Sequence, residues 1–414
     1  MLTTLLRLAL GYTLRPFHFT DQHTEQLSLD VAELGLYVHL PFCKTLCPFC
    51  PYYREKFLQE KVAPFTEALL TEIEAKSRFL NGGKKEVECL YFGGGSPLTL
   101  APQLPEIIAA LQKHYTIRDG IAVEVHPGEL NTESVAHLRD CGVTKLSLGV
   151  QSFSVESLEK LGRKQTASQQ LAFESVAKAG FDVIDVDLIF GIPGQTRETL
   201  REDFLLAVAH GATQISTYPY IDFSYANNRH RPLRARAKKK LLRTLLATAQ
   251  EVGFERSSVW TFSRPGSGRY SSVTRDNFIG FGPSAATLLP DQFHVNTFSV
   301  DAYNAASADP RSLTLQFTPR MRQLYWLFWS SYNLRLDGGD FRNYFSQELI
   351  GQFGWQLRAA RLLRLLQKKD DHYVLTDRGA YYFHLAEQVY THQYIDKMWQ
   401  QAMQTPWPKE VLLY

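Results

Sequence analysis

The sequence has few cysteines and almost no net charge, and it lacks a long hydrophobic run. Only five of the 414 residues are cysteines, an odd number that does not suit the disulfide framework of a secreted protein. Lys and Arg total 45 against 42 for Asp and Glu, so we expect no concentrated basic surface and no nucleic-acid partner. No stretch is long and apolar enough to span a bilayer, so we expect no stable membrane insertion.

The chain is nevertheless rich enough in apolar residues to bury a sizeable core, since 44% of it is hydrophobic. Its start is apolar but is interrupted by Arg7 and lacks the basic region and cleavage site of a signal peptide. We expect a short helix packed on the body of the protein there, with attachment to a membrane surface as the alternative. Three of the cysteines are clustered, which indicates a metal site and a reducing compartment, so the cytoplasm is the expected location.

Short apolar strands alternate with amphipathic helices between residues 34 and 225. The predicted strands are Leu34–Pro41, Val87–Phe92, Ile121–His126, Lys145–Val150, Val183–Phe190 and Gln214–Tyr220. The predicted helices are Ala63–Phe79, Leu104–His114, Thr132–Asp140, Ser168–Ala179 and Glu198–His210. Strands that are apolar throughout and separated by helices indicate parallel βαβ units. Six of them predict an α/β fold, a partial (β/α)6 barrel whose chemistry lies at the C-terminal ends of the strands.

Three further regions flank this barrel. Residues 1–33 form an N-terminal extension, and residues 226–312 complete the barrel or link it to the C-terminal region. Residues 313–414 are expected to be a mostly helical, winged-helix-like domain with one short strand, His372–Leu375. The basic stretch Asn227–Arg243 is interpreted as the solvated face of a helix, with binding of an anionic substrate as the alternative.

The clustered cysteines form a CxxxCxxC motif directly after the first predicted strand, at Cys43, Cys47 and Cys50. Thiolates hold iron–sulfur clusters, and a cube normally takes four of them. Three cysteines without a partnered fourth leave one iron with an open coordination site. The amino and carboxylate groups of S-adenosylmethionine (SAM) would fill that site. An electron from a [4Fe–4S] cluster would then release a 5′-deoxyadenosyl radical, which abstracts a hydrogen atom.

A zinc site and inert cysteines are the alternatives to a cluster. Zinc would require a fourth Cys or His, and the nearby His39 lies inside a predicted strand. We leave open whether His39 acts chemically or packs under the cysteine loop. Cys89 and Cys141 are expected to be small buried hydrophobic residues rather than ligands.

Several residues around the motif are candidates for binding SAM. Phe49 would lie against the adenine, and the glycine run that contains Gly94 and Gly95 could bring backbone amides to a ligand, next to Ser96. Each of these has a simpler interpretation, a packing aromatic or a tight turn after a strand.

Charged residues in apolar strands point to the same end of the barrel. Glu124 would hold ribose hydroxyls or the amine of SAM, with a buried salt bridge as the alternative. Asp185 and Asp187 share one strand face, and Asp187 is nearer the C-terminal end and therefore the chosen ligand. Gln151 follows the fourth strand, and Arg163 would pair with a carboxylate of SAM or of a substrate.

The ordered segments that carry these residues resemble a known family. They are Tyr37–Cys43, Phe92–Pro97, Ser147–Phe153, Asp187–Thr196 and Phe278–Ala285. The chain is similar through them to the oxygen-independent coproporphyrinogen III oxidase (HemN-like) family of radical SAM proteins, over about residues 34 to 305.

This resemblance implies a cluster on the three cysteines, one SAM and often a second beside it, a tetrapyrrole as substrate, and a reductant such as flavodoxin or ferredoxin. It also implies contacts to the cluster-bound SAM from Tyr37, Gly94 and Glu124, with Ala286 close by. The second SAM would be contacted by Gly95, Ser96, Gln151, Arg163, Asp187 and Ile221.

The chain also departs from the family in two places. The oxidases carry another cysteine two positions after the third ligand, where this sequence has Tyr52. The heme chaperones carry an HNxxYW motif, and the corresponding stretch, residues 268–275, lacks its His and Trp. We expect oxidative decarboxylation of a porphyrinogen. The alternatives are a two-SAM radical methyltransferase or heme-opening enzyme, and third a heme-binding chaperone-like protein.

Overall fold

The computed structural model describes residues 17–24, 27–80, 83–164, 168–226, 230–268, 270, 276–306 and 308–413. The short helix predicted at the start of the chain lies outside these residues. So does most of the 268–275 stretch, of which only Gly268 and Tyr270 are described.

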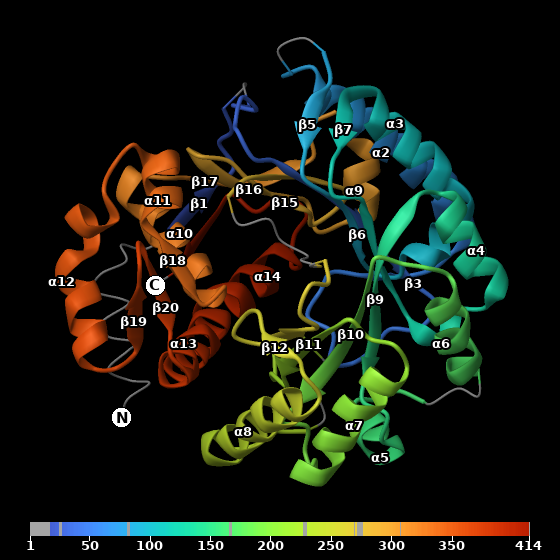
Figure 1. Ribbon diagram of the computed structural model, residues 1–414. Helices are drawn as coiled ribbons and strands as arrows, with labels where there is room; N and C mark the ends of the chain where they lie inside the picture. Colours follow the sequence, from blue (N-terminus) through green and yellow to red (C-terminus); the bar gives the residue numbers. More distant parts are fainter. Residues whose placement is uncertain are drawn as a thin grey trace.

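Six parallel strands form the centre of the fold and follow one another in chain order. They are β2 (Gly35–Leu40), β6 (Leu90–Gly94), β8 (Ile121–Val125), β9 (Val143–Gln151), β10 (Val183–Phe190) and β11 (Gln214–Pro219). The connecting helices cover the outside of the curved sheet (Figure 1), namely α2 (Val62–Ser77), α3 (Leu104–His114), α4 (Thr132–Asp140), α5 (Val155–Lys160), α6 (Ser168–Lys178), α7 (Arg197–Ala209) and α8 (Ala235–Glu251). The predicted partial barrel is confirmed.

The predicted strand Val87–Phe92 is in fact two strands. β5 (Lys85–Val87) pairs with β7 (Tyr115–Ile117) in a separate small sheet, and only β6 enters the barrel. Cys89 lies between them. An apolar run does not show by itself that its first half pairs with a different partner from its second half.

Further strands extend both edges of the barrel into a sheet of fourteen described strands. β12 (Glu255–Arg256) and β13 (Thr261–Ser263) are antiparallel additions beside β11. On the other edge β14 (Phe278–Phe281) runs parallel to β2. It is followed by β15 (Ala286–Leu288), β16 (Gln292–Asn296), β17 (Arg311–Gln316), β1 (Phe17–Thr20) and β21 (Glu410–Leu413). α9 (Val300–Ala305) lies between β16 and β17 in the chain.

The C-terminal region is mostly helical, as predicted. Its elements are α10 (Pro319–Tyr332), β18 (Arg335–Asp337), α11 (Gly338–Phe345), α12 (Leu349–Leu362), β19 (Leu366–Lys369), β20 (His372–Leu375), α13 (Asp377–Tyr390) and α14 (Asp396–Ala402). β18, β20 and β19 form a three-stranded antiparallel sheet with its own small core around Phe341 and Phe353. This order of helices and strands is that of a winged helix. The domain boundaries at residues 33, 225 and 312 stay predictions.

Helix starts in the described chain follow the capping residues of the sequence. Asn131 caps α4 in a reciprocal capping box with Ser134, and Thr196 and Thr376 accept hydrogen bonds from the first turns of α7 and α13. Short polar side chains at these positions satisfy amide groups that would otherwise have no partner.

The basic stretch is largely a solvated helix face. Arg236, Lys240 and Arg243 are exposed on α8, while Leu241 and Leu245 are buried beneath them. Lys238 is the exception, because it is buried and donates to the Tyr220 carbonyl at 3.1 Å. Burial lowers its pKa to about 8.

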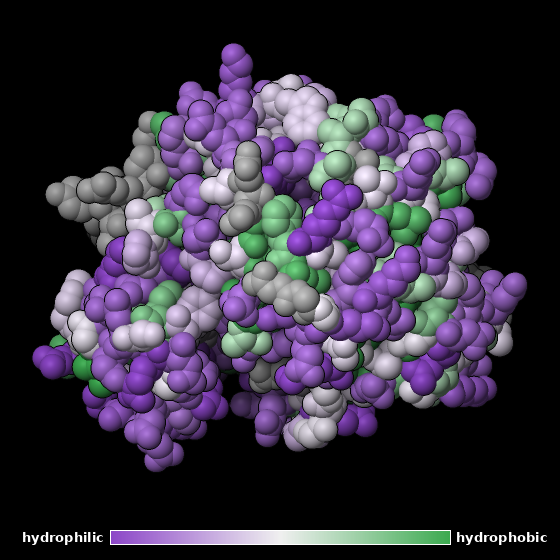
Figure 2. All heavy atoms as spheres, turned by 90° about the horizontal axis from the view of Figure 1, so that it is seen from above, coloured by the Kyte–Doolittle hydropathy of each residue, from purple (hydrophilic) through white to green (hydrophobic). Residues whose placement is uncertain are grey.

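The face in Figure 2 is largely hydrophilic, with hydrophobic side chains in small groups among the charged ones. In the described part of the chain, no helix combines the length and apolar character that crossing a membrane requires.

A buried ion pair connects α2 to the strands beside β2. Glu72 is fully buried and lies 2.7 Å from Lys76 Nζ, which also donates to the Gly280 carbonyl at 2.6 Å. Glu72 accepts from the Gly282 amide and from Asn296 Nδ2, both at 2.7 Å, and from Tyr303. One carboxylate therefore joins α2, β14, β16 and α9.

We predict that Glu72→Ala lowers the free energy of unfolding by about 3–5 kcal/mol, because it leaves the buried Lys76 without its counter-charge. Urea denaturation followed by far-UV circular dichroism measures this. Glu74→Ala is the matched control, since Glu74 is on the same helix with 48% of its side chain exposed. Its exposed pairs are worth less than about 1 kcal/mol. Equal losses in both variants would contradict a structural role for Glu72.

Candidate functional site

The three cysteines of the motif lie on one loop at the C-terminal end of β2. Cys43 ends the short strand β3 (Phe42–Cys43), and the Cys50 amide donates to the Cys47 carbonyl at 3.2 Å. All three are free, partly buried thiols. We call residues 43–50 the cysteine loop.

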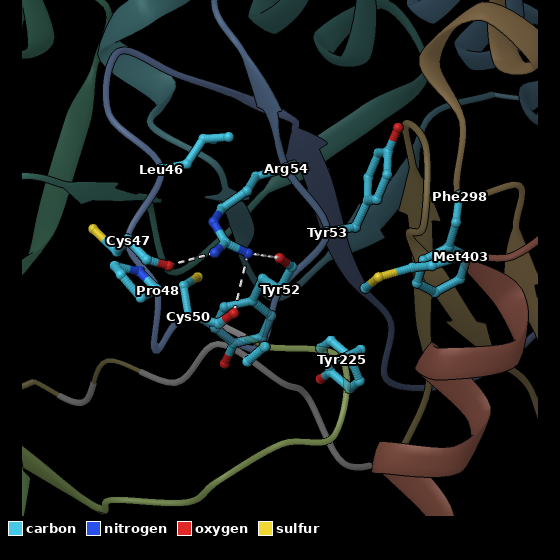
Figure 3. Close-up of a pocket in the computed structure, with 11 residues that line it drawn as sticks. Leu46, Cys47, Pro48, Cys50, Tyr52, Tyr53, Arg54, Tyr225, Phe298 and Met403 are labelled. Atoms are coloured by element: carbon cyan, nitrogen blue, oxygen red, sulfur yellow. Dashed lines mark hydrogen bonds between the residues drawn. The ribbon is translucent and has the colours of Figure 1, made fainter. Parts of the chain in front are cut away.

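Two arginines hold this loop from different sides. The Arg54 guanidinium donates to the carbonyls of Cys47, Cys50 and Tyr52, the last two at 3.0 and 2.9 Å (Figure 3). Arg163 Nε donates to Cys47 Sγ at 3.2 Å, and its Nη1 donates to the Gly149 carbonyl. Sequence reasoning missed Arg54, because its partners are main-chain carbonyls that leave no pattern in the sequence.

Arg163 also lies over the ring of Phe49, with its guanidinium carbon 5.2 Å from the ring centre. Cation–π contacts of this kind are favourable at such distances. Both residues were predicted to bind SAM, and the structure places them together against the cysteine loop.

The glycine run brings β6 against the start of the cysteine loop. The Gly95 amide donates to the Leu40 carbonyl at 2.7 Å and the Ser96 amide to the Phe42 carbonyl at 2.8 Å. A Cβ on Gly95 would lie 2.6 Å from the Phe42 oxygen, which is main chain and cannot move aside. The amides of Gly95 and Ser96 are therefore bonded to protein carbonyls, and a contact of these two residues with a ligand stays a prediction.

Gly94 has a positive φ of 107°, and a Cβ there would lie 2.6 Å from the His39 ring. His39 is buried, with its Nδ1 2.9 Å from the Tyr37 hydroxyl and its Nε2 2.9 Å from the Tyr53 carbonyl. Burial lowers the pKa of His39 to about 4, so the ring is neutral at physiological pH. His39 packs under the cysteine loop with both nitrogens engaged, so it does not offer a fourth ligand.

The acidic candidates lie on adjacent strands. Glu124 on β8 accepts hydrogen bonds from the Tyr91 hydroxyl and, at 3.3 Å, from the Gly94 amide. The Tyr91 hydroxyl in turn accepts a hydrogen bond from the Tyr270 hydroxyl. Burial raises the pKa of Glu124. Its partners are hydroxyl and amide groups, which favours ligand binding over the salt bridge considered from the sequence.

Asp187 on β10 accepts from Ser147 Oγ at 2.7 Å and stays partly exposed, whereas Asp185 is fully buried and accepts from Ser216 Oγ at 2.8 Å. Burial raises the pKa of both carboxyls, and repulsion from Asp185 adds to it at Asp187. Only Asp187 is therefore accessible to a ligand.

The remaining candidates lie around the same end of the barrel. A register shift between β9 and β10 precedes Gln151, which has a positive φ of 71° that is uncommon for a residue with a side chain. Ile221 follows β11 and is partly buried. Ala286 begins β15, one strand beyond β14, whose Gly280 pairs with Tyr37.

Tyrosines that the sequence reasoning did not single out line this end of the barrel. Tyr52 and Tyr218 keep 47% and 37% of their surface exposed. Burial is nevertheless the main cause that raises the pKa of each, followed by nearby carboxylates such as Glu124 and Asp187. Side chains that are both exposed and surrounded by protein line a concave surface. The sequence did offer a signal for Tyr218, because its position in β11 puts it on the same strand face as Gln214 and Ser216.

Comparison with known proteins agrees with this geometry. The sequence profile described as the radical SAM superfamily matches residues 37–207. The solved structure of coproporphyrinogen III oxidase (HemN) from Escherichia coli superposes with a TM-score of 0.77, covering 92% of this chain and 98% of that one at 23% identity. Residues 37–207 are therefore recognised as a radical SAM region.

Relatives within the superfamily fall in its HemN/HemW-like group. Oxygen-independent coproporphyrinogen III oxidase from Pseudomonas aeruginosa is 28% identical over 362 residues, 76% of this chain and 77% of its own. Heme chaperone HemW from Lactococcus lactis is 27% identical over 302 residues, 70% of this chain and 78% of its own. Anaerobilin synthase from Escherichia coli O157:H7 is 32% identical over 187 residues, 44% of this chain and 42% of its own.

Membership of the superfamily implies a [4Fe–4S] cluster and SAM. The donor set fits the cluster, because three free thiols share one loop next to a concave surface. Within the described residues, which include all three, no three His, Cys, Asp or Glu side chains are grouped as ligands of a single metal ion. A cube differs from a single ion, since each thiolate binds a separate corner iron.

The pKa of Cys43 is raised to about 12, chiefly by burial and then by Cys50 and Cys47. Iron binding therefore has to displace the proton of this thiol. Cys89 and Cys141 were expected to be small buried hydrophobic residues, and both are only partly buried. Both are outside the cysteine loop.

We predict that Cys43→Ala, Cys47→Ala and Cys50→Ala each reduce iron from about four atoms per chain to a small fraction of that after anaerobic reconstitution. The iron content and the visible sulfur-to-iron charge-transfer absorbance of the cluster measure this. Cys89→Ala and Cys141→Ala are the matched controls and should keep full iron. Retention of iron by the Cys43→Ala variant would overturn the assignment of the cluster.

Proposed function

We propose that this radical SAM enzyme acts on a tetrapyrrole and that its reaction is the oxidative decarboxylation of porphyrinogen propionates. The observation that carries the proposal is the surroundings of the cysteine loop, where Tyr52 and Tyr218 offer aromatic faces and where Arg54 and Arg163 offer positive charge on different sides of the loop. Aromatic faces suit pyrrole rings, and guanidinium groups suit carboxylates. The names of the oxidase relatives support the choice of substrate.

The reaction fixes what the protein has to provide. Each propionate loses one hydrogen atom from its β carbon, one electron and carbon dioxide, and becomes a vinyl group. When bound, the cluster supplies the electron that cleaves SAM into the radical that takes this hydrogen atom. The electron left on the substrate needs an acceptor, and the cluster needs a donor such as flavodoxin or ferredoxin.

The chain's own residues would position the reactants. We place the cluster on Cys43, Cys47 and Cys50 and the first SAM against Tyr37, Gly94 and Glu124, with Ala286 nearby. The residues proposed for a second SAM are Gly95, Ser96, Gln151, Arg163, Asp187 and Ile221. Glu124 suits hydroxyl or amine groups, because it already accepts hydrogen bonds from Tyr91 and the Gly94 amide.

A second candidate is transfer of a methyl or methylene group to an sp² carbon by use of two SAM molecules, as in methyltransferase and heme-opening members of the family. Tyr52 favours it, because this partly exposed side chain stands where the oxidase pattern has a cysteine. The identity with anaerobilin synthase points the same way. A heme-binding, chaperone-like role is third.

We predict that the anaerobically reconstituted protein, given SAM, dithionite and coproporphyrinogen III, forms 5′-deoxyadenosine and releases carbon dioxide from the substrate. Mass spectrometry of the products measures both. Formation of S-adenosylhomocysteine together with a product that keeps its carboxylates would contradict decarboxylation and support methyl transfer. Absence of 5′-deoxyadenosine with any tetrapyrrole would leave only the binding role.

Glu124→Gln tests the SAM contact in the same assay. We expect the KM for SAM to rise about tenfold, which corresponds to about 1.4 kcal/mol, because the amide keeps the shape of the side chain but loses its charge. Glu133→Gln, an exposed position on α4, is the matched control. An unchanged KM for SAM in the Glu124 variant would remove this residue from the binding site.

A further inference from the structure

A cavity of about 400 Å³ lies against the cysteine loop, and Arg163 is not among its described lining residues. Cys47 and Cys50 line it together with Tyr52, Arg54 and Tyr225 (Figure 3). Phe298, which precedes α9, and Met403, which directly follows α14, close it from the opposite side. The cavity therefore joins the barrel to the C-terminal region, and its volume is in the range of small-molecule sites.

Cys47 separates this cavity from the surface proposed for SAM. Its Sγ accepts from Arg163, which is tied to the Gly149 carbonyl on β9, whereas its carbonyl accepts from Arg54, which lines the cavity. Among the described residues that line the cavity, Cys43, Gly94, Glu124 and Asp187 do not occur. The cavity is thus next to the proposed cluster ligands, and its described lining differs from the residues proposed to contact SAM.

Tyr52 is the wall that the two spaces share. It lines the cavity, and it is close enough to Glu124 and Asp187 for their charges to raise its pKa, after the larger effect of burial. A ligand that spans both spaces would have to pass this ring.

The chemistry of the lining suits a flat unsaturated ring with an acidic substituent. Tyr52, Tyr225 and Phe298 provide aromatic surface, and Met403 provides a polarizable contact. Arg54 uses three of its five N–H donors on loop carbonyls, and its buried Nε has no hydrogen-bond partner in the described structure. The guanidinium of Arg54 therefore keeps donors that loop carbonyls do not use, and a carboxylate in the cavity would add a charge-assisted interaction with it.

We propose that this cavity anchors one propionate-bearing pyrrole ring of the substrate, with its carboxylate on Arg54, while a neighbouring ring lies on the SAM side of Tyr52. The inference rests on the proposed tetrapyrrole substrate and adds the place where a ring that is not reacting is held. Binding energy from such a remote ring positions the reacting propionate.

Met403→Trp tests the inference, because it fills the cavity from the C-terminal side without changing the cysteine loop. The measurements on reconstituted protein are the Kd of coproporphyrin III by fluorescence titration, the iron content, and the formation of 5′-deoxyadenosine without substrate. We expect the Kd to rise at least tenfold while iron content and substrate-free SAM cleavage stay at wild-type values. Gln401→Trp, which adds the same bulk at an exposed position of α14, should bind like wild type.

Ala226→Phe fills the cavity from another residue of its lining and should give the same result, so that a folding defect in either variant does not decide the test. Wild-type Kd values in both filled variants, with tetrapyrrole bound by the wild-type protein, would overturn the inference and leave the proposed function standing. Weaker binding of SAM in place of coproporphyrin III would also overturn it. Failure of the wild-type protein to bind any tetrapyrrole would instead remove the proposed function, and the inference with it.

Discussion

The cysteine loop depends on two backbone hydrogen bonds from the neighbouring strand, Gly95 to Leu40 and Ser96 to Phe42. These bonds require β6 to approach the end of β2 more closely than any side chain at position 95 would permit. They fix where the loop begins, and Arg54 and Arg163 then fix its two sides. Gly95 therefore supports the start of the cysteine loop, because only a glycine lets β6 come this close to the end of β2.

The barrel interior at this end carries carboxyl and phenol groups that are hydrogen-bonded to one another or to neighbouring hydroxyls. Tyr91, Tyr270 and Glu124 form a hydrogen-bonded chain, and burial raises the pKa of all three. Asp185 and Asp187 on β10 follow the same rule. Such a surface can form hydrogen bonds with the hydroxyl and amine groups of a ligand. It also keeps the positive charge of the site at the two arginines of the loop.

The parallel strands and their helices could be predicted from the sequence, because the burial of each element sets the spacing of its apolar residues. β10 is an example, since it begins and ends at the predicted residues. The sequence also placed Glu124 and Gln151 near the C-terminal ends of their strands, where the structure has them. It could not show that Val87 and Leu90 belong to different sheets, since both are apolar and buried. Arg54 and the edge strands of residues 255–296 were missed for a related reason: their partners are backbone groups brought close only by the fold.

The position of β1 between β17 and β21 has a consequence for the C-terminal region. The chain leaves the large sheet at β17 and returns to it at β21, so both ends of the helical excursion are about two strand spacings, roughly 10 Å, apart. The winged-helix-like part is thus attached to the large sheet through two strands, β17 and β21, rather than through one. A strand from the start of the protein, β1, lies between those strands and pairs with both, so residues from the two ends of the chain hold the base of the C-terminal region together.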